Sequence, residues 1–166
     1  MTLRVLSLFD TPASVEPWAP IDDRVMGGVS RSRLRFDPAG HAWFEGEVSL
    51  AQGGGFASVR SQPGALGAPG ASACVIEVLG DGKAYKLSLF SSDAFDGMSY
   101  QSPFRPAAGA WTTLRLPLAD FRPSFRGRAV PGAPPLDPAR LRQLGLTIAE
   151  RQAGPFALAL RSIELE

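Results

Sequence analysis

The residues most able to do chemistry lie in one short stretch, "PIDDRVMGGVS" at positions 20–30. It places two adjacent carboxylates, Asp22 and Asp23, beside Arg24 and Met26, and a glycine pair follows. Carboxylates at such positions can transfer protons or bind a cation, and glycine-rich loops can surround a phosphate. The stretch could therefore be a catalytic loop, a metal loop, a phosphate cradle or only a tight corner between strands.

A catalytic carboxylate pair is not favoured by the spacing. Successive residues of an extended segment point to opposite sides, so Asp22 and Asp23 cannot both face one substrate. A hydrolase would need a second acid from elsewhere, and Asp81 and Asp120 are the candidates. A Ser–His–acid triad would have to use His41, which lies in the turn sequence "DPAGHAW", and no G-x-S-x-G occurs. We therefore expect no enzyme, with a hydrolase as the least favoured alternative.

Metal and phosphate sites lack their usual patterns. His41 and Cys74 are the only good nitrogen and sulfur ligands, and they cannot complete a tetrahedral zinc site. Asp22 and Asp23 could offer oxygens to a structural calcium ion, but no D-x-D-x-D-G spacing supports one. The glycines of 53–56 are not followed by G-K-[ST] or by a helix signal. We expect no metal and no cofactor, and we expect a bulge or a close backbone approach at these glycines.

What remains is a set of polar and aromatic residues at strand ends and in loops. Arginine, tyrosine and tryptophan dominate binding surfaces, because they combine large contact area with directed hydrogen bonds. The candidates of this kind, with the polar residues beside them, are Asp22, Asp23, Arg24, Arg60, Tyr85, Tyr100, Gln101 and Arg126. An equally supported alternative is that Arg24 or Arg60 pairs internally with Asp22 or Asp23 and locks the loop.

Short apolar runs separated by turns must position these residues. Glycine (18) and proline (15) make up a fifth of the 166 residues, a pattern typical of an all-β sandwich or barrel. Apolar residues alternate with polar ones in 42–50 and 111–121, and Pro117 suggests a strand end or a sheet edge. Two further strands are expected at 145–150 and 155–165.

Two local patterns predict more specific structures. Two β-rich runs in 71–90 flank Asp81-Gly82, a dipeptide that suits a type I′ turn, so a β-hairpin is expected there. Asp137 can cap a helix that Gly145 closes, which predicts one helix of two turns. The fold class we expect is thus all-β with one or two short helices.

Composition limits the partners and the compartment. The 17 basic and 16 acidic residues give a net charge of +1, so nucleic acid or a whole-molecule polyanion is not expected. Cys74 is the only cysteine and lies among apolar residues, which predicts a buried thiol and no internal disulfide. Neither a signal peptide nor a transmembrane stretch of about 20 apolar residues is seen. We expect one domain over 1–166 with a cytoplasmic location.

The order of motifs resembles a known family. The blocks run "W-x-x-x-DDRVMGGVS", "F-x-G-x-VSL", "GGGFASVRS", "GDGKAYKL", "YQSPF", "W-x-TLRLPLADF" and "LGLTIAERQAGPFALAL", from Trp18 to Leu160. This strongly resembles the complex I intermediate-associated protein 30 family. The resemblance implies a galactose-binding-domain-like jelly-roll β-sandwich without catalytic activity. Relatives act as assembly chaperones of the respiratory NADH:ubiquinone oxidoreductase, whereas the present chain shows no mitochondrial targeting extension and looks bacterial.

The resemblance also assigns roles to residues by family analogy. We expect the glycines and the buried aromatic residue to shape the sandwich: Gly27, Gly28, Gly54, Gly55, Trp111 and Gly127. We expect the other motif positions to line one shared partner- or ligand-binding surface: Asp22, Asp23, Arg24, Met26, Arg60, Asp81, Tyr85, Tyr100, Gln101 and Arg126. The sequence does not decide whether the "DDR" residues contact a partner or brace the loop.

The leading hypothesis is a non-catalytic module that binds a protein partner, such as an intermediate of a respiratory complex. The alternative is a β-sandwich that binds carbohydrate or a small ligand. A sugar site needs an aromatic platform beside carboxylates and amides, and Trp43 or Tyr100 with Asp23 and Gln101 could supply one.

Overall fold

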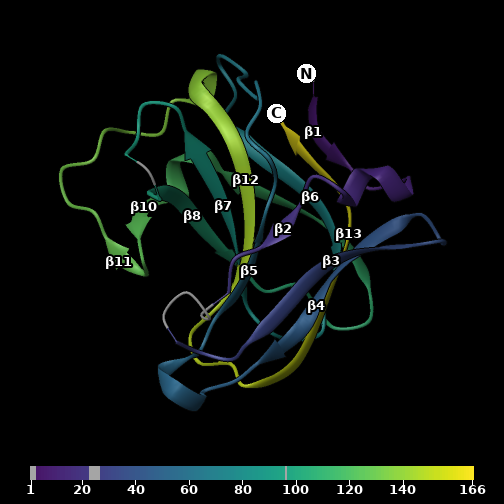
Figure 1. The fold of residues 1–166 in the computed structure, drawn as a ribbon. Helices are drawn as coiled ribbons and strands as arrows, with labels where there is room; N and C mark the ends of the chain where they lie inside the picture. Colours follow the sequence, from purple (N-terminus) through teal and green to yellow (C-terminus); the bar gives the residue numbers. More distant parts are fainter. Residues whose placement is uncertain (1–2, 23–26, 96) are drawn as a thin grey trace.

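Alternating apolar side chains give two antiparallel sheets in this computed structural model, which describes residues 3–22, 27–95 and 97–166. The sheets pack face to face, with the chain crossing repeatedly from one to the other (Figure 1). Sheet A has the strand order β3-β4-β13-β6-β9, with β1 also paired to β13. Sheet B has the order β11-β10-β8-β7-β12-β5-β2.

The strands of sheet A are β1 (Arg4–Leu8), β3 (Arg31–Asp37), β4 (His41–Val48), β6 (Ala73–Leu79), β9 (Trp111–Pro117) and β13 (Gly154–Leu165). Those of sheet B are β2 (Ala19–Pro20), β5 (Ala57–Arg60), β7 (Tyr85–Ser91), β8 (Ser99–Phe104), β10 (Arg122–Phe125), β11 (Arg128–Ala129) and β12 (Leu141–Ile148). Helical structure in the described residues is limited to short 3-10 segments: η1 (Pro12–Val15), η3 (Ala51–Gly53), η4 (Leu118–Asp120) and η5 (Pro138–Arg140).

The core lies between the two sheets. Phe44 and Leu158 enter it from sheet A, and Leu87 and Leu146 enter it from sheet B, all with no exposed surface. Each comes from a strand in which apolar and polar positions alternate, so one face of each sheet is buried. The prediction of an all-β sandwich is confirmed. No helix within the described ranges is long and apolar enough to cross a membrane.

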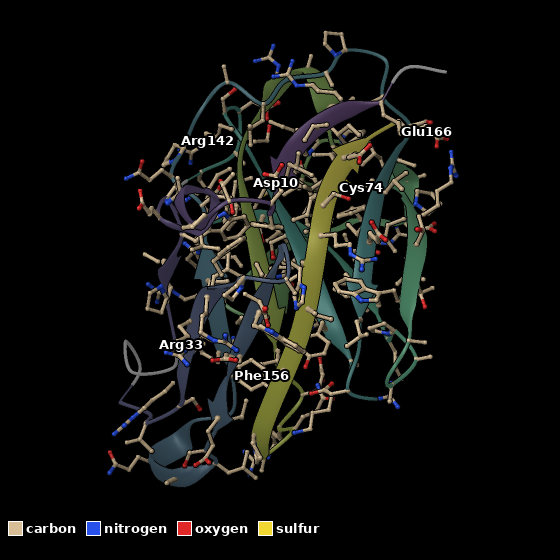
Figure 2. The ribbon with its side chains drawn as sticks, turned by 90° about the vertical axis from the view of Figure 1, so that its right-hand side faces the viewer. Asp10, Arg33, Cys74, Arg142, Phe156 and Glu166 are labelled. Carbon is tan, nitrogen blue, oxygen red and sulfur yellow. The ribbon has the colours of Figure 1, made fainter. Side chains whose placement is uncertain are left out.

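The longest strand, β13, organises sheet A. Its first half pairs with β4, its second half pairs with β1, and β6 lies along its other edge. Figure 2 shows this strand running along the sheet, with Phe156 near one end and Glu166 just beyond the other. At the edge of the same sheet lies β9, which ends at Pro117 as the sequence indicated.

The hairpin predicted at 71–90 is wrong. Both runs are strands, but β6 belongs to sheet A and β7 to sheet B, so Asp81-Gly82 lies in a crossover between the sheets. Only Gly82 of the pair has a positive φ, +87°, whereas a type I′ turn requires two such residues. A two-residue hairpin turn with two such residues is found instead at Arg126-Gly127, with φ of 51° and 76°, between the paired strands β10 and β11.

The helix predicted between Asp137 and Gly145 is also largely wrong. The Asp137 side chain does accept a hydrogen bond from the Ala139 backbone N–H, but only the 3-10 segment η5 follows it. The chain then enters β12 at Leu141, because Leu144, Leu146 and Ile148 alternate and fill the core between the sheets.

Candidate functional site

The opening motif is anchored by Asp22, whose carboxylate joins the two sheets. It accepts hydrogen bonds from the Ser32 backbone N–H at 3.1 Å, the Ser32 hydroxyl at 2.5 Å and the Ser58 backbone N–H at 2.9 Å. Ser32 lies on β3 of sheet A and Ser58 on β5 of sheet B. Asp22 is only 7% exposed, so this carboxylate braces the fold instead of facing a partner.

The rest of the motif is only partly visible. Asp23, Arg24 and Met26, predicted to line the binding surface, lie outside the described residues. Gly27 is exposed with a φ of +89°, a left-handed conformation that glycine adopts without strain, and Gly28 is buried. Among the other predicted structural glycines, Gly54 ends the 3-10 segment η3, which stands where a bulge was expected.

Asp81 and Tyr85, predicted on the shared surface, form an internal network instead. The Tyr85 hydroxyl donates to Asp81 Oδ2 at 2.9 Å, and the Ala157 backbone N–H donates to the same oxygen at 2.9 Å. Tyr85 is 1% exposed because it faces the core side of β7, the same side as Leu87 two residues later. Burial, and then the charge of Asp81, raises the pKa of the Tyr85 phenol far above its ordinary value. The network fixes the crossover between the sheets.

Tyr100 and Arg126 also lie apart from each other. Tyr100 is 2% exposed, and its hydroxyl donates to the Pro134 carbonyl at 2.6 Å, which fastens the proline-rich loop over the core. Arg126 is exposed at the tip of the β10–β11 hairpin, with its guanidinium 5.1 Å from the centroid of the Phe125 ring. The described members of the predicted set therefore do not share one surface.

Two of the predicted residues, Arg60 and Gln101, do come together on one face of sheet B. Cross-strand pairing links Arg60 to Gly145, Gly145 to Ser88, Ser88 to Gln101 and Gln101 to Arg122. Directly paired residues point to the same side of a sheet, and this side is opposite the core. We call these five residues the polar row: Arg60, Gly145, Ser88, Gln101 and Arg122.

The polar row has long side chains at its ends and short ones in its middle. Gln101 Nε2 donates to Ser88 Oγ at 3.0 Å, and the Arg60 guanidinium lies 4.8 Å from the centroid of the Phe90 ring. Gly145 lies close to the Phe90 ring and to Ser88, because a Cβ added there would be 3.3 Å from atoms of both. The ring of Phe90, 3% exposed, is thus part of the floor and offers no open stacking face.

The charges of the two sheets are distributed unequally. The seven strands of sheet B contain no Asp or Glu, but they carry five basic residues: Arg60, Lys86, Arg122, Arg128 and Arg142. The strands of sheet A carry six arginines and also five acids: Asp37, Glu45, Glu47, Glu77 and Glu164. By the pairing register, Arg60, Lys86 and Arg122 lie on the side of sheet B that faces away from the core, and Lys86 forms an ion pair with Glu150 at 2.9 Å.

Several charges on the outward face of sheet A are paired within that face. Arg33 and Arg35 both contact Glu45, at 2.6 and 2.9 Å, beside an open depression of about 600 Å³. The Arg161 guanidinium lies 3.9 Å from the Trp111 ring, and Trp43 Nε1 donates to Asp37 at 3.0 Å. The predicted sugar platform is not assembled, because Trp43 lies on this face, Gln101 lies on sheet B and Tyr100 lies in the core.

No catalytic set is assembled from the described residues. Asp22 and Asp81 each accept hydrogen bonds from the protein interior and do not face each other across an open site. No group of three or more His, Cys, Asp or Glu that could hold a metal is present in the described part of the chain. Cys74 is buried, as predicted, and burial raises the pKa of its thiol to about 12, so it is not a nucleophile at neutral pH.

Sequence reasoning missed Ser88, Gly145 and Arg122. A signal for Ser88 was present, because Lys86, Ser88 and Phe90 alternate with Leu87 and Leu89 and must face away from the core. The lack of acids in the strands of sheet B is also present in the sequence, but it can be recognised only once the strands that share the sheet are known. The pairing that brings Gly145 between Arg60 and Ser88 is not visible in the sequence.

Comparison with known proteins identifies relatives by sequence. Residues 7–160 match the family described as complex I intermediate-associated protein 30. A Drosophila melanogaster protein named "Complex I intermediate-associated protein 30, mitochondrial" is 26% identical over 182 aligned positions, which cover 95% of this chain and 61% of that protein. An uncharacterised protein of Schizosaccharomyces pombe is 34% identical over 77 residues, covering 44% of this chain and 35% of its own length. The chain thus spans less than two thirds of either relative.

Solved structures with the same fold include carbohydrate-binding modules. A family 11 module from Clostridium thermocellum, in complex with a β-1,3-1,4-mixed-linked tetrasaccharide, has a TM-score of 0.71 at 15% identity, covering 98% of this chain and 94% of that chain. An agarase has a TM-score of 0.63 at 11% identity, covering all of this chain but 25% of that chain. At such identities the likeness establishes the fold, a galactose-binding-like β-sandwich as predicted.

Proposed function

The chain belongs to the complex I intermediate-associated protein 30 family, and from that premise we propose that it is a non-catalytic module that binds a protein partner through the polar row of sheet B. By family, the partner is an intermediate in the assembly of the respiratory NADH:ubiquinone oxidoreductase. The observation that carries this proposal is the polar row, which has Arg60 and Arg122 at its ends and lies on strands without Asp or Glu.

The charge of that face determines the chemistry of the partner. Arg60 and Arg122 stand at the ends of the polar row, and arginine pairs with carboxylates through a planar fork that suits protein interfaces. An acidic surface of the partner is therefore expected to meet these two arginines. The two arginines are four strand steps apart, so acidic groups of the partner should be separated by about 19 Å.

The middle of the polar row is low and buried. Gly145 and Ser88 are buried beneath the Phe90 ring and their neighbours, so the row is low in its middle and the contacts come from the longer side chains around it. The Gln101 amide already donates to Ser88 and keeps its carbonyl oxygen for a partner N–H. A row with an arginine at each end and hydrogen-bonding groups between them suits a specific but reversible protein contact. Such a contact can bury less than about 1,200 Å².

Affinity capture from the native organism, followed by mass spectrometry, tests the proposal. We compare the wild-type domain with the double variant Arg60→Gln/Arg122→Gln, which removes two positive charges but keeps the stem that covers Phe90. The matched control is Arg31→Gln/Arg33→Gln, which removes two exposed charges from sheet A. We expect the double variant to lose the partner, and the control to retain it.

Two results would count against the polar row. One is full retention of the partner by the double variant, and the other is equal loss in the control. Unfolding curves for both variants must match that of the wild type, so that a lost partner is not a lost fold. Cell fractionation in the same organism tests the cytoplasmic location, which stays a prediction because the Drosophila relative is named as mitochondrial.

Carbohydrate binding is the second candidate, because Gln101, Ser88 and Arg122 on a sheet face could bond sugar hydroxyls. It is less well supported, since the Phe90 ring lies under Arg60 and is only 3% exposed, so it offers no stacking face. Calorimetry with the mixed-linked tetrasaccharide tests it. We expect no heat of binding at millimolar sugar. If the wild type bound the sugar and the Arg60→Gln/Arg122→Gln variant did not, the polar row would be a glycan site and not a protein-binding site.

A further inference from the structure

The hairpin of β10 and β11 ends sheet B in a narrow tip. β11 has two residues and is the outermost strand of the sheet, and the turn that joins it to β10 is Arg126-Gly127. Figure 1 shows this hairpin at the edge of the molecule, away from both chain termini. The tip is therefore free to meet another surface without interference from the ends of the described chain.

An aromatic pair stands beside this tip. The Phe95 ring lies 5.2 Å from the Phe125 ring in an edge-to-face arrangement, and Phe95 is 51% exposed. Gly97 packs beneath the pair, because a Cβ added there would lie 2.9 Å from the Phe125 ring. The Phe95 ring thus lies against Phe125 with about half of its surface exposed, although it is a large apolar side chain that burial would favour.

Basic side chains lie on the hairpin that carries Phe125. Arg126 covers the Phe125 ring at 5.1 Å, and Arg122 and Arg128 are exposed on the same hairpin. Within the described residues no salt bridge links any of these three arginines to a carboxylate. The tip is a local positive cluster, and at physiological salt such a cluster acts over roughly 8 Å whatever the net charge of the chain.

We propose that this hairpin tip, defined by Phe95, Phe125, Arg126 and Arg128, docks onto an anionic lipid surface. An exposed aromatic ring reaches the boundary between headgroups and acyl chains, while the arginines around it contact lipid phosphates and keep their stems on the apolar side. The proposal uses residues outside the centre of the polar row, so it stands or falls independently of the proposed function.

The shape of the tip favours a lipid surface over an acidic protein. A specific protein contact needs a broad complementary area of about 1,000 Å² or more, and a two-residue turn beside a two-residue strand offers little. A bilayer surface deforms around a narrow projection and supplies anionic groups at every position. One ring and a few arginines give weak, reversible attachment, which needs a second contact for stable anchoring.

Vesicle sedimentation tests the proposal. We compare vesicles of phosphatidylcholine alone with vesicles containing about one third phosphatidylglycerol, in the presence and absence of high salt. The test variant is Arg126→Gln/Arg128→Gln, and the matched control is again Arg31→Gln/Arg33→Gln on sheet A. A second variant, Phe95→Ser, removes the exposed ring and leaves the charges in place.

We expect wild type and control to bind the anionic vesicles and not the neutral ones. Each arginine near a charged surface contributes about fivefold, so the double variant should bind about 25-fold more weakly, and Phe95→Ser should weaken binding several-fold. Equal affinity for both vesicle types, or equal loss in the control, would overturn the proposal. So would binding of soluble poly-glutamate through the same arginines without vesicle binding, which would make the tip a site for acidic protein.

Discussion

The Asp22 carboxylate accepts the backbone N–H of Ser58 at 2.9 Å, across thirty-six residues of sequence. The same side chain binds Ser32 on the other sheet, so one acid ties the start of the "DDRVMGG" motif to both layers of the sandwich. The first acid of the motif is structural.

Replacing Asp22 by alanine should therefore destabilise the fold. The change leaves the Ser58 N–H buried without an acceptor and removes two bonds to Ser32, which should lower the free energy of unfolding by about 3 kcal/mol. Urea denaturation measures the loss. Asp120→Ala, at an exposed acid, should change stability by less than about 0.5 kcal/mol. Equal effects of the two changes would mean that Asp22 does not brace the sheets.

Tyr85 and Asp81 should be energetically coupled. A double-mutant cycle of Tyr85→Phe and Asp81→Asn isolates the hydrogen bond between them, and we expect a coupling free energy of about 1–2 kcal/mol. Thermal or urea unfolding of the two single variants and the double variant supplies the values. Purely additive effects would show that the bond contributes nothing to holding the crossover.

Alkaline pH should destabilise the protein through its tyrosines. The chain has 2 tyrosines, and burial raises the pKa of both Tyr85 and Tyr100 in the folded state. Above the unfolded value of about 10, the unfolded chain releases phenolic protons that the folded chain retains, so stability falls as pH rises. Tyrosinate absorbance should appear only together with the loss of the circular dichroism signal. Tyrosinate in a still-folded protein would contradict this prediction.

Gly46→Ala should disrupt the pairing of β3 with β4. A Cβ at Gly46 would lie 2.0 Å from the Arg31 carbonyl oxygen, a backbone atom that can move only if the strands separate. We expect a loss of at least about 3 kcal/mol of unfolding free energy, or failure to fold. Gly64→Ala is the matched control, because nothing lies within 4 Å of an added Cβ there. Circular dichroism with urea titration distinguishes the two.

Alternation of apolar residues was enough to predict the sandwich and the strands β4, β6, β7, β9, β12 and β13, because burial on one face depends mainly on local sequence. It was not enough to predict which strands pair. Asp81-Gly82 has good turn chemistry, yet the Asp81 side chain is bonded to Tyr85 and Ala157, a contact between distant segments that directs the chain into the second sheet. Arg126-Gly127 makes the tight hairpin turn, although arginine is an unusual residue at positive φ.

The candidate site was predictable only in part for a related reason. From residue type alone, Arg60, Gln101, Tyr85 and Tyr100 were all predicted to be binding residues. The side of the sheet that each one faces depends instead on its position within its strand. Tyr85 is two residues from Leu87 and therefore enters the core, where its hydroxyl finds Asp81. Arg60 and Gln101 face away from the core. They lie in one row only because β5, β12, β7 and β8 are neighbours in the sheet, and the sequence does not specify that pairing.

The central position of β13 has a consequence for the order in which the chain can fold. Residues 154–165 fill the gap between β4 and β6, so the layer formed by these strands stays divided until that segment has been synthesised. A growing polypeptide on the ribosome would expose the apolar sides of both halves until residue 165 has left the exit tunnel. Such exposed apolar surface makes the incomplete chain prone to aggregation until its last strand is in place.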